Sequence, residues 1–151
     1  MKQNLATALC ALVARLVLAG VFAIAALPKI KDPVAFAASI HGYQVIDGVL
    51  VNWVALVLPW LELTVAIGLL VPSIRHASAV CIGGLLVVFI GLHASAWRRG
   101  LDISCGCFGT GAEPTTDYSL LILRNVGLLL AVIWIFWRDC AAKSQTSEIA
   151  L

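Results

Sequence analysis

Residues 49–97 of the chain read VLVNWVALVLPWLELTVAIGLLVPSIRHASAVCIGGLLVVFIGLHASAW. Two apolar segments in this stretch, residues 49–71 and 74–97, are each long enough to cross a bilayer, whose hydrocarbon core needs about 20 apolar residues in a helix. Only Pro72 and Ser73 separate them. The sequence therefore predicts a tight hairpin of two membrane-spanning helices.

Two further segments of this kind flank the hairpin, at residues 5–27 and 118–137. Of the 151 residues, 62% are hydrophobic and 12% are charged, against about 45–50% and 25% in soluble domains. A soluble domain this small cannot bury so much apolar surface. The composition excludes a soluble enzyme, a disordered chain and a nucleic-acid-binding protein. We expect an all-α integral membrane protein, a bundle of four transmembrane helices over residues 1–137, with a polar tail at 138–151.

The first span has some features of a secretory signal peptide, with Lys2 before an apolar run and small residues near position 25. Its length and the presence of Arg15 in its middle favour a retained helix. Asp32 and Pro33, after the first span, suit an N-cap and a first helical position, and Gly42 can end a helix. They predict a short interfacial helix between the first and second spans.

Four spans place both termini on one side of the membrane. Each side of the membrane carries four basic residues, so the positive-inside rule does not orient the protein. They are Lys2, Arg75, Arg138 and Lys143 on the side of the termini, and Lys29, Lys31, Arg98 and Arg99 on the other side. Arg98 and Arg99 by themselves favour placing the loop at 98–117 in the cytoplasm.

That loop contains Cys105 and Cys107 with Gly106 between them, followed by Phe108 and Gly109. A disulfide across one residue needs a strained backbone, which glycine tolerates, and strained disulfides exchange readily. The pair is therefore a candidate redox couple. A static disulfide and metal binding by two thiolates remain alternatives, although two ligands and no nearby His are too few for a closed zinc site. We expect no metal.

The remaining cysteines carry weaker signals. Cys10 and Cys81 lie within spans, where we expect them to pack as small apolar residues. Cys140 lies in the polar tail without an evident partner.

Charged side chains at bilayer depth are a second candidate site. Arg15, Glu62 and Arg124 lie within spans, and His93 lies near the end of one. Helical rise places Arg15 and Glu62 roughly 18–20 Å from the cysteine side of the membrane. We expect them to pair. The arrangement is either a structural ion pair or a polar pocket that holds a quinone or relays protons.

Several local patterns together resemble one family of membrane proteins. They are Arg15 in a first span that ends in AALPKIKDP, LPWLEL at 58–63, CGCFG at 105–109 and LRN at 123–125. The chain resembles the MauE/DoxX family of redox-associated membrane proteins, and within it the methylamine utilisation branch. The resemblance covers roughly residues 15–137.

The resemblance implies four membrane helices in the inner membrane and a role in the maturation, disulfide formation or transport of a periplasmic client. That client would be the small subunit of methylamine dehydrogenase, with a thioredoxin-like protein as a further candidate partner. Cys105 and Cys107 would be the redox pair facing the periplasm, supported by Gly106, Phe108 and Gly109, and both termini would be cytoplasmic. The protein would then act as a thiol–disulfide oxidoreductase.

Two other functions stay open. In the first, the protein is a non-catalytic membrane chaperone or assembly subunit, and a disulfide between the two cysteines only stabilises the loop. In the second, it is a quinone-linked oxidoreductase subunit of the DoxX type. The chain has no dinucleotide-binding fingerprint and no haem-attachment motif, so any electron carrier would be a partner protein or a dissolved quinone.

Overall fold

The computed structural model describes residues 5–101 and 117–149, with side chains as far as Ala141. This part of the chain contains no strand and five helices: α1 (Leu5–Lys31), α2 (Pro33–Gly42), α3 (Val49–Gly68), α4 (Arg75–Arg98) and α5 (Tyr118–Ile149). All except α2 are long and apolar enough to cross a membrane. The predicted fold class is confirmed: the protein is a four-span helical membrane protein.

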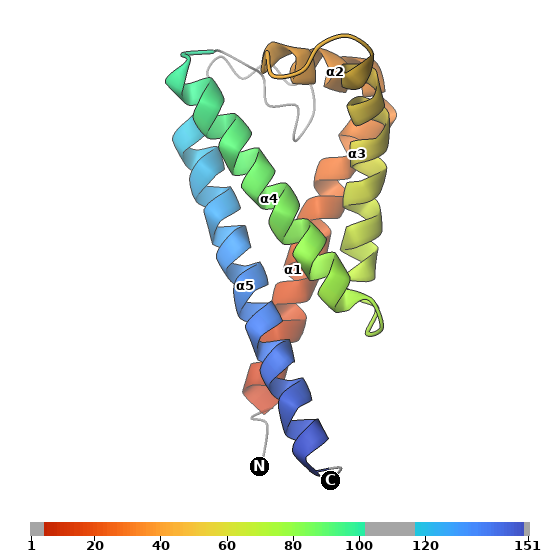
Figure 1. Ribbon diagram of the computed structural model, residues 1–151, viewed down its shortest axis with the longest axis vertical. Coiled ribbons are helices and arrows are strands. Elements are labelled where there is room, and N and C mark those ends of the chain that lie inside the picture. The colour runs from red at the N-terminus through yellow and green to blue at the C-terminus, as the bar shows by residue number, and fades with distance from the viewer. Residues whose placement is uncertain (1–4, 102–116, 150–151) are drawn as a thin grey trace.

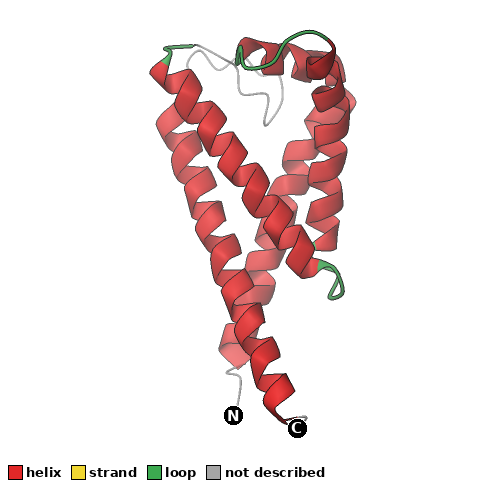
Figure 2. Cartoon of the chain, viewed as in Figure 1, coloured by secondary structure: helices red, strands yellow, loops and turns green. Residues whose placement is uncertain are grey.

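The four long helices run in alternating directions along one long axis (Figure 1). α1 packs mainly against α3, and α4 packs mainly against α5. α1 begins and α5 ends at the same end of the bundle, and α2 lies across the opposite end. We call the end that α2 covers the α2 end. Apart from short connections such as the α3–α4 turn, the described chain is helical (Figure 2).

The short helix between the first two spans begins where the sequence predicts. The Asp32 side chain accepts a hydrogen bond from the Ala35 amide at 2.9 Å, and Pro33 occupies the first helical position. α2 ends at Gly42. A carboxylate cap and a proline suit this place because the first amides of a helix have no partners within it.

Two helices continue past the limits expected for the spans. α1 continues through Pro28 to Lys31, which is possible because a proline so near the end removes one hydrogen bond without interrupting a long ladder. α5 continues to Ile149, through the stretch expected to be a polar tail. With 27 and 32 residues, these helices are roughly 40 and 48 Å long. Both project beyond the α3–α4 turn (Figure 1).

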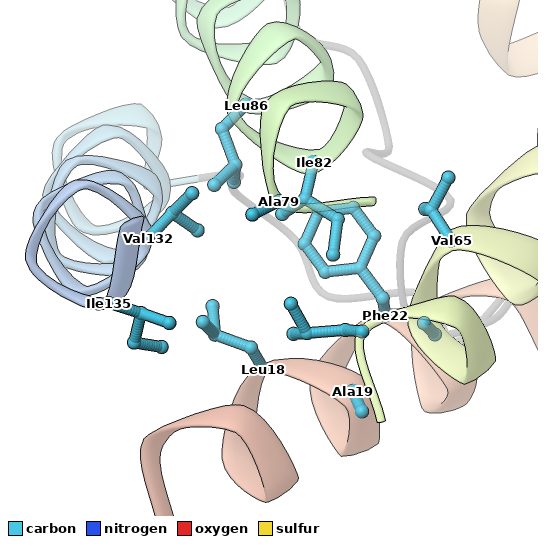
Figure 3. Close-up of a cluster of buried hydrophobic side chains, with 11 residues drawn as sticks. Leu18, Ala19, Phe22, Val65, Ala79, Ile82, Leu86, Val132 and Ile135 are labelled. Carbon is cyan, nitrogen blue, oxygen red and sulfur yellow. The ribbon is translucent and has the colours of Figure 1, made fainter. Parts of the chain in front are cut away.

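The four long helices share one apolar core (Figure 3). Phe22 and Leu18 of α1 lie at its centre, and Ile82 of α4 and Ile135 of α5 close it from the other side. Leu18, Ile82 and Ile135 are almost fully buried. The core holds the two helix pairs together in the half of the bundle away from α2.

Polarity is distributed inside out compared with a soluble bundle. Many large apolar side chains point outward and are more than half exposed, among them Val13, Leu56, Trp60 and Leu130. The buried polar side chains of the described residues are those of Lys29, Glu62, Ser78, His93, Asn125 and Asp139. This is expected where the surrounding solvent is lipid, because polar groups at bilayer depth must find partners inside the protein.

Candidate functional site

The most deeply buried charges are an ion pair between α1 and α3. Lys29 Nζ lies 2.7 Å from Glu62 Oε1 and 2.8 Å from Glu62 Oε2. The two side chains are 3% and 1% exposed, so neither water nor salt screens the pair. The Lys29 ammonium also lies over two aromatic rings, 5.1 Å from the centroid of Phe36 and 5.4 Å from that of Phe89.

The expected pairing of Arg15 with Glu62 is therefore wrong. The prediction compared the depths of the two residues along the helix axes and ignored the length and direction of their side chains. Side chains in a helix lean toward its N-terminus, and α1 and α3 run in opposite directions. The Lys29 side chain, at the end of α1, therefore points away from the α2 end into the bundle. The Glu62 side chain points toward the α2 end and meets that of Lys29.

Arg15 pairs instead with Asp139 near the far end of α5. Its Nη2 donates to both carboxylate oxygens of Asp139, at 2.5 and 2.7 Å. Arg75, the first residue of α4, lies 3.5 Å from the same carboxylate. The group links three helices at the end of the bundle that lies opposite α2. Arg15 and Glu62 thus belong to two separate ionic sites.

His93 and Arg124 lie near Glu62. Together with Asn125 and Lys29, they line a small cavity of about 30 Å³ beside the ion pair. A water molecule takes up roughly this volume, and polar groups are present to bind it. We call Lys29, Glu62, His93, Arg124 and Asn125 the buried polar cluster. The residues of this cluster come from α1, α3, α4 and α5.

His93 connects this cluster to the α2 end of the bundle. Its Nδ1 lies 2.5 Å from the Phe89 carbonyl oxygen, and because a carbonyl only accepts, Nδ1 must donate. The ring lies between two tyrosines, with centroid distances of 6.0 Å to Tyr43 and 6.5 Å to Tyr118. His93 is 3% exposed, and both tyrosines are buried as well.

Two hydrogen bonds involve the residues that flank residues 102–116. The Tyr118 hydroxyl donates to the Leu101 carbonyl at 2.5 Å, and Arg99 Nη2 donates to the Tyr43 carbonyl at 2.5 Å. The first bond joins the end of α4 to the start of α5. The second joins α4 to the connection between α2 and α3.

The first turn of α5 has a carboxylate cap. Asp117 Oδ1 accepts from the Ser119 hydroxyl at 2.6 Å and from the backbone amides of Ser119 and Leu120 at 3.1 and 3.3 Å. These hydrogen bonds, the one from the Ser119 hydroxyl above all, lower the pKa of Asp117. The carboxylate therefore stays ionised and the cap stays formed at neutral pH.

The predicted redox motif, Cys105 and Cys107 with Gly106, Phe108 and Gly109, lies outside the described residues. The other three cysteines are free and exposed on the outside of the helices. The expectation that Cys10 and Cys81 pack inside the bundle is wrong. In lipid, an apolar thiol has no reason to avoid the outer surface, since the bilayer is as apolar as the protein core.

Sequence reasoning missed two partners in the ionic sites. Lys29 was counted among the basic residues outside the spans, and Asp139 was assigned to the tail. Both lie in helices that continue beyond their apolar segments. The available signal was the length of the lysine side chain, which can extend from the end of one span along the helix toward an acidic residue in the neighbouring span.

Residues 7–138 match the model of the family described as methylamine utilisation protein MauE. The chain belongs to this family. Several relatives carry the name methylamine utilization protein MauE. The one from Methylorubrum extorquens AM1 is 35% identical over 114 residues, which cover 75% of this chain and 61% of the relative. The one from Paracoccus denitrificans is 37% identical over 115 residues, covering 76% and 61%.

A third MauE relative, from Methylophilus methylotrophus, is 39% identical over 119 residues, which cover 78% of this chain and 63% of the relative. The matched part of the chain thus spans about three-fifths of the length of these relatives. No solved structure matches the chain significantly. The MauE relationship therefore establishes the family, and the bundle geometry comes from this chain alone.

Proposed function

We propose that this MauE family member is a membrane-embedded thiol–disulfide protein of methylamine utilisation. It supports the maturation, disulfide formation or transport of a periplasmic client, the small subunit of methylamine dehydrogenase. The observation that carries the proposal is the Cys105–Gly106–Cys107 motif inside the region that matches the family model.

The chemistry is thiol–disulfide exchange. A thiolate of one partner attacks the disulfide of the other, forms a mixed disulfide, and a second thiolate then resolves it. One disulfide breaks for each that forms, so two electrons pass between the Cys105–Cys107 pair and the client or a thioredoxin-like partner. The direction depends on the two reduction potentials.

The geometry of the bundle supports this role because hydrogen bonds and ion pairs connect its helices. The connection between α4 and α5 contains the two cysteines, and a hydrogen bond joins Leu101, shortly after the end of α4, to Tyr118, the first residue of α5. Beneath them, the Lys29–Glu62 pair links α1 to α3. Joining the two ends of a connection lowers the conformational entropy that the connection can lose when a partner binds.

The client sets the location and orientation in this proposal. A periplasmic client requires the protein to lie in the inner membrane, with the connection between α4 and α5 on the periplasmic side. Since α1 begins and α5 ends at the other end of the bundle, both termini are then cytoplasmic. Cys140 would face a reducing compartment, where an unpaired thiol persists.

The test uses cells that lack the native gene and express Cys105→Ser, Cys107→Ser or the matched control Cys140→Ser. The readout is the disulfide state of the client small subunit, measured by thiol alkylation and gel shift. We expect each motif variant to leave the client thiols unpaired and the control to behave as the wild type. A fully oxidised client in the Cys105→Ser/Cys107→Ser double variant would refute the proposal.

A second readout distinguishes thiol–disulfide exchange from a purely structural role of the two cysteines. If the cysteines only stabilise a non-catalytic assembly subunit, both motif variants will lower the amount of protein in the membrane in proportion to the loss of client maturation. In exchange chemistry, the amount of protein stays constant. Labelling intact cells with an impermeant maleimide, before and after reduction, tests the orientation: labelling only after lysis would contradict it.

A further inference from the structure

A second, larger cavity lies next to the buried polar cluster. Its volume is about 310 Å³, and it lies between α2, α3 and α4 at the α2 end of the bundle. α3 and α4 diverge from their short turn toward this end, and α2 crosses over it (Figure 1). The volume is at the lower limit of the roughly 300–1,000 Å³ typical of small-molecule sites.

Almost the whole lining is apolar, with side chains such as Ile40, Val54, Leu58 and Leu92. The polar residues are Lys29, Tyr43 and His93. Lys29, Phe89 and His93 line the small polar cavity as well, so they form a wall between the two. A cavity with apolar walls and a polar patch suits a molecule with an apolar body and a polar head.

The charges select an uncharged head. Among the described residues of the lining, Lys29 alone has a permanent full charge, and the carboxylate of Glu62 neutralises it at 2.7 Å. An anionic head would compete with Glu62 and leave a buried carboxylate without its partner, which is strongly unfavourable. An ammonium has three N–H donors, and the two bonds to Glu62 use two. The third can donate to a carbonyl oxygen.

Aromatic side chains favour a flat head group. The rings of Phe36 and Phe89 both line the cavity and both flank the Lys29 ammonium, at 5.1 and 5.4 Å. A planar ring placed beside the ammonium can stack on them while its carbonyl accepts from Nζ.

The cavity is reached from the surface that faces lipid. Val45 and Val88 line it, and each is 56% exposed. A ligand that enters between them comes from the bilayer, and its apolar tail can remain there.

We propose that this cavity binds an uncharged, lipid-soluble quinone, with a ring carbonyl at Lys29, the ring against Phe36 and Phe89, and the tail leaving past Val45 and Val88. The proposal goes beyond the thiol–disulfide function and does not depend on it. It concerns a binding site within the described helices.

The first experiment measures the binding of decylubiquinone to the purified full-length protein in lipid nanodiscs. Cys105→Ser and Cys107→Ser are present throughout, so that failure of the thiol–disulfide proposal cannot affect the result. We expect saturable binding. Val54→Trp fills the cavity and should weaken binding by at least about tenfold, because the indole takes the space of the ligand. Val57→Trp is the matched control, because Val57 is 55% exposed and lies outside the lining.

The second experiment tests recognition of the head group. Decylbenzene has a similar ring and tail but no carbonyl, and we expect it to compete at least about tenfold more weakly than the quinone. Lys29→Met combined with Glu62→Met keeps the charge balanced and should weaken quinone binding to the level of decylbenzene.

Three results would overturn the proposal. They are no saturable binding of decylubiquinone, equal effects of Val54→Trp and Val57→Trp, and equal competition by decylbenzene. The last would make the cavity a site for lipid acyl chains. Thermal unfolding of every variant reports whether it folds, and the competition experiment needs no variant in the cavity.

Discussion

Replacing Glu62 with Gln should be among the most destabilising single changes that this bundle can undergo. Glu62 is 1% exposed and holds Lys29 through two short hydrogen bonds. Gln leaves the ammonium buried without a counter-charge. Removing one partner from a buried ion pair destabilises proteins by about 3–5 kcal/mol. Since domains have a total stability of about 5–15 kcal/mol, this is a large share.

The size of this destabilisation follows from the burial of the Lys29–Glu62 ion pair. Exposed ion pairs contribute only about 0–1 kcal/mol because water and salt screen them. Here the two side chains are 3% and 1% exposed, and the surrounding medium is lipid. The balanced variant Lys29→Met/Glu62→Met removes both charges and leaves neither unpaired. It should lie within about 1–2 kcal/mol of the wild type, since well-packed apolar replacements of buried pairs are often neutral.

The assay is a double-mutant cycle, with the free energy of unfolding measured by titration with SDS in mixed micelles. We expect strong coupling between Lys29→Met and Glu62→Met. Arg15→Met and Glu62→Met should be additive within about 0.5 kcal/mol, as distant sites without shared partners are. Additive losses for Lys29 and Glu62, or strong coupling between Arg15 and Glu62, would refute the pairing seen in the structure.

Three further changes test other contacts. Asp139→Asn should destabilise the bundle by about 3 kcal/mol in the same titration, because it leaves Arg15 facing a neutral amide; an unchanged midpoint would contradict this. Gly68→Ala should lower stability by about 1–3 kcal/mol, since a new Cβ would lie 2.3 Å from Ser78 Oγ; Ser78→Ala should restore most of the loss, and no restoration would place the strain elsewhere. Asp32→Ala should remove about 1 kcal/mol through loss of the α2 cap, with Asp32→Asn as the conservative control; equal stability of the two would argue against capping.

The sequence predicted the features that depend on local composition. Membrane-length apolar segments predicted four spans, because a helix in lipid must satisfy its backbone internally and present apolar side chains over about 30 Å. Asp32, Pro33 and Gly42 predicted α2, because capping depends on neighbouring residues only. The motifs around Glu62 and the cysteines predicted the family. The roles of Cys105 and Cys107 stay predictions.

Only the tertiary structure decided which charges meet. Hydropathy ended the first span before Pro28, so Lys29 was excluded from the membrane, yet α1 continues and carries Lys29 to Glu62. Arg15 and Asp139 lie 124 positions apart and meet because α5 extends past its apolar segment. Ion pairing depends on helix register, tilt and side-chain direction, which are set by packing among four helices. The sequence identifies the charged residues, and the assembled bundle selects their partners.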